Sequence, residues 1–173
     1  MPINMDIGGS IVNRKSSIEE DGLIRFILML HLVGLALGLG GLLCHLVLLA
    51  GYRMPQDLAA RVGAERCAGS ILTLIQKPGI YLAIATGAGL VWLADPDLLH
   101  QGWLQFKLLF VFWIALATRL MSRNVVHIST LREQSGGEDS SRLSSLKANH
   151  TMIGSVTLLS FLFVIIFSLW KPF

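Results

Sequence analysis

The stretch that decides the fold is HLVGLALGLGGLLCH, His31 to His45, which is apolar throughout except for the histidine at each end. On a helix, His31, Gly34, Gly38, Gly41 and His45 follow one another at spacings of 3, 4, 3 and 4 residues. All five therefore share one stripe of the helix surface. Such a stripe is either a seam where helices touch or the wall of a pocket for a flat ligand.

The composition of the chain indicates a membrane protein. Of its 173 residues, 53% are hydrophobic and 14% are charged, whereas soluble domains have about 25% charged residues. The 14 Lys and Arg against 11 Asp and Glu are too small an excess to argue for nucleic acid binding. The two cysteines, Cys44 and Cys67, lack a CxxC spacing and are interpreted as packing residues.

Four segments are long and apolar enough to cross a bilayer as helices of about 20 residues. We therefore expect an all-α fold, an integral membrane four-helix bundle, in which a polar leader over residues 1–22 precedes one membrane domain over residues 23–173. The first span is interpreted as retained and not as a cleaved signal peptide. A short interfacial helix is expected between the first two spans, and a flexible loop after the third. The spans are expected at about 23–50, 70–94, 102–121 and 151–170.

The basic residues of the loops predict the orientation. With four spans, both termini and the turn between the second and third spans share one side of the membrane, called side A here; the other two loops lie on side B. Nine Lys and Arg on side B against four on side A favour side B in the cytoplasm. We therefore expect a bacterial inner-membrane protein with both termini outside the cytoplasm.

Ionisable residues within the spans are the first candidates for a functional site, because a charge at membrane depth costs about 2.5–3.5 kcal/mol even on insertion scales. His31 lies about two turns inside the first span. Lys107 lies five residues into the third span, one turn after Trp103, and both spans start on side A. The two polar residues therefore lie at similar depth, which suggests a site between the helices. The alternatives are a hydrogen-bonded packing histidine and a lysine that reaches the interface.

His45 follows His31 by 14 residues, a rise of about 21 Å. This spacing suits two stacked haems, but a two-haem bundle needs a second helix with a matching pair, and the sequence has none. His45 is also placed to form a second metal site with His127 or His150 on side B. The alternative is a solvated histidine at the interface.

Several short motifs occur along the spans in a recognisable order. They are His31 with Gly41, Pro78 with Gly87, the opening GWLQFKL of the third span, and the terminal Lys171-Pro172-Phe173. In these features the chain resembles the HemJ-type protoporphyrinogen oxidases, four-span membrane proteins similar to the CopD-like group. The resemblance implies a haem b inside the bundle and oxidation of protoporphyrinogen to protoporphyrin. It implies that His31, as ligand of the haem iron, and Lys107 serve haem binding and catalysis.

The chain also departs from the pattern of that family. Gln105 stands where the family usually has histidine, and Asn149-His150-Thr151-Met152 stands where it usually has an Asn-Glu pair and a proline. The first span carries glycine where the family tends to have tryptophan. An electron-transfer or accessory subunit that binds haem fits these departures equally well.

The leading hypothesis is a redox protein that binds haem b or a porphyrin between the first and third spans. His31 is expected to ligate the iron, Gly34 and Gly38 to form a flat wall, and Lys107 with Trp103 to hold the propionate edge. A porphyrin substrate, a quinone or a membrane redox partner is then implied. No GxGxxG, P-loop, HExxH or GxSxG motif supports another chemistry.

Two alternatives belong to other classes of function. One is a structural or assembly subunit, in a homo-oligomer or a larger membrane complex, whose glycine stripe docks another helix. The other is a metal-handling protein with histidine and methionine ligands, for which Met29 and Met121 form no methionine-rich cluster.

Overall fold

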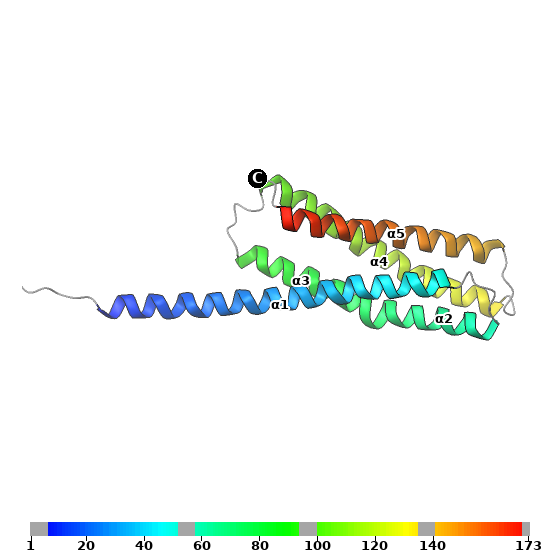
Figure 1. The fold of residues 1–173 in the computed structure, drawn as a ribbon, viewed down its shortest axis with the longest axis horizontal. Coiled ribbons are helices and arrows are strands. Elements are labelled where there is room, and N and C mark those ends of the chain that lie inside the picture. Colours follow the sequence, from blue (N-terminus) through cyan, green and yellow to red (C-terminus); the bar gives the residue numbers. More distant parts are fainter. Residues whose placement is uncertain (1–6, 52–57, 94–99, 135–140, 171–173) are drawn as a thin grey trace, which may run out of the picture.

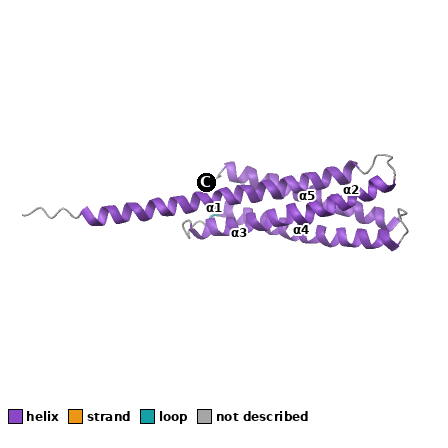
Figure 2. Cartoon of the chain, turned by 90° about the horizontal axis from the view of Figure 1, so that it is seen from below, coloured by secondary structure: helices purple, strands orange, loops and turns teal. Residues whose placement is uncertain are grey.

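The computed structural model describes residues 7–51, 58–93, 100–134 and 141–170, and these residues are almost entirely helical. The chain folds as an all-α bundle whose helices run up and down side by side (Figures 1 and 2). Four helical stretches are long and apolar enough to cross a membrane, at Asp21–Leu49, Val62–Leu93, Gly102–Leu131 and Ser141–Ser168. The predicted four-span membrane bundle is confirmed at this level.

The first helix, α1 (Ile7–Gly51), begins inside the predicted polar leader and continues into the first span. Its N-terminal part extends beyond the rest of the bundle (Figure 1). Within the bundle, α1 packs chiefly against α3 (Lys77–Leu93) and also against α2 (Leu58–Ile71) and α5 (Ser141–Trp170). The remaining helix, α4 (Gly102–Gln134), packs mainly against α5 and makes little contact with α3.

The second span is longer than the sequence predicts. Instead of a separate interfacial helix followed by a span from about residue 70, α2 runs through a π-helical segment, η1 (Leu72–Gln76), directly into α3. In η1 the backbone N–H of Lys77 donates to the carbonyl of Leu72, five residues earlier. Pro78 follows at once, and because proline has no N–H, a wide turn before it accommodates the missing helical bond.

The last two helices also extend past their predicted ends. α4 continues to Gln134, and α5 begins at Ser141, inside the segment expected to be a flexible loop. The reason is visible in the packing, because Leu143 and His150 are fully buried and share a face with Leu146. Spacings of 3 and 4 residues make this polar-looking stretch amphipathic. Residues 135–140 of the loop, and the terminal 171–173 motif, lie outside the described residues.

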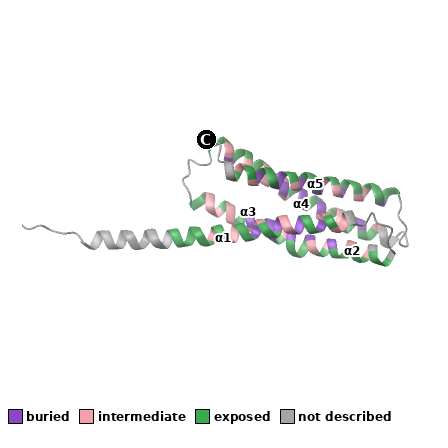
Figure 3. Ribbon diagram, viewed as in Figure 1, coloured by how far each residue is buried: buried purple, intermediate pink, exposed green. Residues whose placement is uncertain are grey.

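The core forms along the axis of the bundle, and the outer faces are exposed and apolar. In Figure 3, buried residues occur along the stretches where the helices lie together, and the part of α1 that projects from the bundle has none among its coloured residues. Phe106, Leu109 and Phe112 are each more than 60% exposed, as expected for side chains that face lipid. The buried hydrophobic cluster joins α1, η1, α3, α4 and α5 through Leu42, Leu72, Ile80, Ile114, Met121, Phe161 and Val164.

Candidate functional sites at the two ends of the bundle

The glycines of the opening stretch form the seam between α1 and the second span. A Cβ on Gly34 would lie 2.6 Å from the backbone nitrogen of Ala83, and one on Gly41 would lie 2.8 Å from the Cβ of Gln76. Gly38 is similarly close to Ile80, at 3.0 Å. Backbones approach this closely only where side chains are absent. Gly34 and Gly38 therefore lie in a packing seam, and neither lines the two cavities described below.

The side A cavity lies between α1, α3, α4 and α5 and has a volume of about 290 Å³. Three residues singled out from the sequence line it together: His31 from α1, and Trp103 and Lys107 from α4. The rest of the lining is apolar, with small residues from α3 such as Gly87 and bulky ones such as Phe161. Residues at similar depth in the first and third spans thus share one cavity.

His31 is held by α3 in one orientation. Its Nδ1 lies 2.9 Å from the carbonyl oxygen of Ala83 and 3.2 Å from the hydroxyl of Thr86. Since a carbonyl only accepts, Nδ1 carries the proton, and the neutral ring keeps a lone pair on Nε2. A backbone carbonyl that holds one ring nitrogen in this way is the usual support of a metal-ligating histidine.

The hydroxyl of Thr86 completes this support. It donates to the carbonyl of Leu82 at 2.6 Å, so its oxygen remains an acceptor for the Nδ1–H of His31. Gly87 gives the ring its space, because a Cβ there would lie 3.0 Å from Cε1 of His31. From the sequence, Gly87 enters only as part of the family resemblance, and Thr86 is not singled out as a site residue. Their spacing from Ala83 on one helical face is the signal that links them to the histidine.

Lys107 is half-buried and faces the same cavity as His31. Among the residues that the structure describes, which exclude the loop at 94–99, no carboxylate forms an ion pair with it. Trp103 donates its indole N–H to the side chain of Gln101 at the side A end. Gln105, the departure from the family pattern, is exposed and does not line the cavity.

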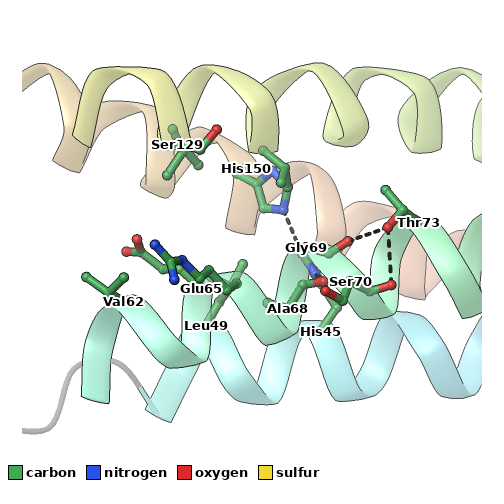
Figure 4. Close-up of a pocket in the computed structure, with 13 residues that line it drawn as sticks. His45, Leu49, Val62, Glu65, Ala68, Gly69, Ser70, Thr73, Ser129 and His150 are labelled. Carbon is green, nitrogen blue, oxygen red and sulfur yellow. Dashed lines mark hydrogen bonds between the residues drawn. The ribbon is translucent and has the colours of Figure 1, made fainter. Parts of the chain in front are cut away.

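The side B end contains a second cavity, of about 520 Å³, with His45 and His150 in its lining. The two histidines are fully buried, and their Nε2 atoms lie 2.6 Å apart (Figure 4). The Nδ1 of His45 also lies 2.9 Å from the carbonyl oxygen of Ala68. One chain of polar contacts therefore connects α2, α1 and α5. His127 is exposed and does not line this cavity, although its neighbours Val125 and Ile128 do.

Two polar residues of the core were not predicted as site residues. Both polar side-chain atoms of Gln76 are buried without a hydrogen-bond partner, as is the indole nitrogen of Trp113. Gln76 closes η1 against Gly41, so it lies between the two ends of the bundle. A single amide within an apolar run is the only sequence signal for it.

The described residues include no group of three or more His, Cys, Asp or Glu arranged to hold a metal ion. Cys44 and Cys67 are free and exposed, and Met121 is buried in the hydrophobic core. The soft ligands that a metal-handling protein needs are therefore not gathered at either cavity.

Comparisons with protein-family models, with curated proteins and with solved structures give no match for this chain.

Proposed function

We propose that this chain is a haem-b-binding membrane protein with a redox role, and that haem or a porphyrin binds in the side A cavity. The observation that carries the proposal is the state of His31. Its Nδ1–H is bound to the carbonyl of Ala83, so the Nε2 lone pair of this cavity-lining imidazole would be available to ligate a haem iron.

The other lining residues suit the remaining parts of such a ligand. Lys107 offers a cation without a carboxylate partner among the described residues, and a propionate would supply one. Trp103 lies one turn closer to side A, where the polar edge of the ligand would emerge. The apolar side chains between them exclude water from the ring. When bound, haem supplies one-electron chemistry, and the protein contributes orientation and charge.

The size of the cavity is the strictest test of this fit. At about 290 Å³, it is at the lower end of the range of about 300–1,000 Å³ that small-molecule pockets occupy. A tetrapyrrole needs more room than this. The contact between α3 and α4 is slight, so a separation of these two helices would give the ring more room, and one of its edges would then face lipid.

Two reactions are compatible with this site. One is the oxidation of protoporphyrinogen that the family resemblance implies, and the other is electron transfer to a quinone or a membrane partner. In both, His31 and Lys107 touch the ligand, while Ala83 and Thr86 fix the orientation of His31.

The alternative of a subunit that docks a partner through its glycine stripe is less well supported. Gly34, Gly38 and Gly41 are all covered by α3 or η1 of the same chain. A partner helix therefore has no access to these glycines.

The absorbance spectrum of protein purified after haem-replete expression tests the proposal. We expect a Soret band that His31→Ala removes and that His100→Ala leaves unchanged, because His100 is an exposed side A histidine outside both cavities. His45→Ala distinguishes the two ends of the bundle. Absence of a Soret band in the parent chain, or its loss only in His45→Ala, would contradict the assignment.

The orientation is a second proposal, carried by the basic residues of the side B loops. A green fluorescent protein fused to the C-terminus folds in the cytoplasm but not after export through the general secretory route. We expect the fusion to be produced and dark, whereas bright cells would place side A in the cytoplasm.

A further inference from the structure

The histidine pair at side B has a proton arrangement fixed by its neighbours. His45 must donate from Nδ1 to the carbonyl of Ala68, so the Nε2 of its neutral ring carries a lone pair. Two facing lone pairs, or two facing N–H groups, would repel at 2.6 Å. His150 therefore donates from Nε2 to His45. The Nδ1 of His150 then carries a lone pair and no hydrogen, so it can only accept a hydrogen bond.

This acceptor has no partner in the described structure. His150 is 0% exposed, and its Nδ1 is buried without a hydrogen bond. A buried acceptor left without a donor costs about 1–3 kcal/mol, and such groups usually mark a missing ligand or water. Because His150 also lines the 520 Å³ cavity, this cavity is the place from which a donor would come.

Much of the wall of the side B cavity is apolar. Leu49, Val62, Val125 and Ile128 form much of the lining. The hydroxyl groups in the lining are largely used within their own helices, since Thr73 donates to the carbonyl of Gly69 (Figure 4) and Ser129 to that of Val126. The lining also includes two charged side chains, those of Arg66 and of Glu65, which pairs with Lys147 at 3.0 Å. The cavity thus offers one buried acceptor without a hydrogen-bond partner, His150 Nδ1, beside a largely apolar wall.

The cavity also reaches the outside of the bundle. Arg66, Ser70 and Ser129 belong to its lining and are exposed. His45 lies only four residues before Leu49, the last residue of the first span, which is about 6 Å of helix rise. The site therefore lies at the depth where a membrane-soluble ligand places its polar end.

The geometry does not suit a metal ion held between the two rings. With metal–nitrogen bonds of about 2.0–2.1 Å, two nitrogens bound at right angles or tetrahedrally lie about 2.9–3.4 Å apart. The observed 2.6 Å is shorter, and the described residues offer no third ligand in the group.

We propose that the side B cavity binds a lipid-soluble quinol, whose ring hydroxyl donates a hydrogen bond to Nδ1 of His150. The choice of a quinol rests on the redox role proposed above, because such a protein needs a membrane-soluble partner for its electrons. The need for a donor and for an apolar body rests only on the cavity itself.

The fixed tautomers give this site a preference between the two redox forms. A quinol has O–H groups and can donate to His150, whereas the quinone has carbonyl oxygens, which only accept. Reversing His150 to offer an Nδ1–H would leave two facing lone pairs at the Nε2 atoms, since Ala68 holds His45 in its tautomer. The reduced form should therefore bind at least about tenfold more tightly.

Isothermal titration of the full chain in detergent micelles with decylubiquinol, kept reduced under anaerobic conditions, tests the proposal. Decylubiquinone and the dimethyl ether of the quinol are the matched ligands, because they keep the ring and tail and lose the donor. We expect one quinol site per chain and binding of both control ligands weaker by about tenfold or more. These arms need no substitution, so they do not depend on a variant that folds.

Variants then locate the site. His150→Phe removes the acceptor and keeps an aromatic ring, and we expect it to weaken quinol binding by about tenfold or more. His127→Phe is the matched control, on the same side of the bundle but outside the cavity, and should bind as the parent does. Equal binding of the ether and the quinol, no binding at all, or one Zn²⁺ bound per chain and lost in His150→Phe would overturn the proposal.

The titration of the parent chain separates this inference from the proposed function. Quinol binding by a parent chain that shows no Soret band would leave the side B site established and refute only the haem site. A Soret band together with no preference for the quinol would do the opposite. If both proposals hold, His31→Ala should lose the Soret band and still bind the quinol as the parent does.

Discussion

The contact of Gly34 with α3 leads to the most direct test of the fold. Replacing Gly34 with alanine adds a Cβ that would meet the backbone nitrogen of Ala83 at 2.6 Å and the carbonyl oxygen of Gly79 at 2.9 Å. These are backbone atoms of a helix and cannot rotate away. The two helices must therefore separate by about 0.8 Å, the difference between 2.6 Å and the 3.4 Å at which ordinary contact begins.

The energetic cost follows from this displacement. Overpacking of a tight interface costs about 1–3 kcal/mol, and alanine recovers about 1 kcal/mol of helix propensity over glycine. A net loss of up to about 2 kcal/mol is expected. Gly40→Ala is the matched control, since a Cβ on Gly40 meets nothing within 4 Å. That variant should gain up to about 1 kcal/mol from propensity alone.

Thermal unfolding in detergent, followed by tryptophan fluorescence, measures the difference. For a chain of this size, about 1 kcal/mol corresponds to about 2–4 °C in Tm, so Gly34→Ala should unfold up to about 8 °C below the parent and Gly40→Ala at or above it. Equal Tm values for the two variants would refute the reasoning.

A second readout concerns the side A cavity. The same Ala83 that Gly34 touches accepts the hydrogen bond of His31 at 2.9 Å. A separation of about 0.8 Å would lengthen that bond beyond hydrogen-bonding range. We therefore expect Gly34→Ala to reduce any Soret band as well, while Gly40→Ala does not.

Three further predictions concern charged and polar side chains. Lys107→Met removes a half-buried cation and should therefore stabilise the haem-free chain by about 1 kcal/mol or less, which thermal unfolding measures. The same variant should lower the haem content, whereas Lys107→Arg should retain the haem; absorbance measures this effect. A double-mutant cycle of His45→Phe and His150→Phe should give a coupling of about 0.6–1.7 kcal/mol in detergent unfolding, and additive losses would argue that the 2.6 Å contact does not form. The ion pair of Glu65 with Lys147, at 3.0 Å, should contribute about 1 kcal/mol or less; Glu65→Gln should lower Tm by only a few degrees, and less in high salt.

The architecture of the bundle could be predicted because it depends on a simple quantity, the length of apolar sequence. Four apolar runs gave four spans, and none of them required knowledge of a tertiary contact. The ends of the helices could not be predicted in this way. Ser141 to Lys147 is polar and serine-rich, and only the burial of Leu143 against other helices shows why it is helical.

The site was predictable where depth alone decides proximity. His31, Trp103 and Lys107 share a cavity because two spans that start on the same side bring equal depths together. Rotation of the helices about their axes was not predictable, because a sequence of nearly uniform hydropathy gives no amphipathic face. For this reason Gly34 and Gly38 were expected to face a ligand, although they face α3.

The histidine pair also shows that the rotation of a helix about its axis could not be predicted from the sequence. The sequence places His45 where it can meet His127 or His150, and in the structure it contacts His150, whereas His127 is exposed. The two candidates lie at similar depth, and which of them meets His45 depends on the faces that α4 and α5 turn to the axis. The carbonyl of Ala68, which fixes the tautomer, carries no signal in its side chain.

The wide turn η1 has a consequence for the register between α1 and the second span. His31 and His45 are 14 residues apart on α1, whereas the carbonyls that they bind, those of Ala83 and Ala68, are 15 residues apart on the facing helix. Two regular α-helices could not satisfy both bonds equally well, because the surplus residue would add about 1.5 Å and a rotation of about 100°. A π turn takes up one extra residue. The one-residue surplus therefore requires the wide turn to lie between Ala68 and Ala83, and Leu72–Gln76 lies there. A residue inserted or deleted between these two carbonyls would change the register, so that His31 and His45 could no longer both keep their hydrogen bonds.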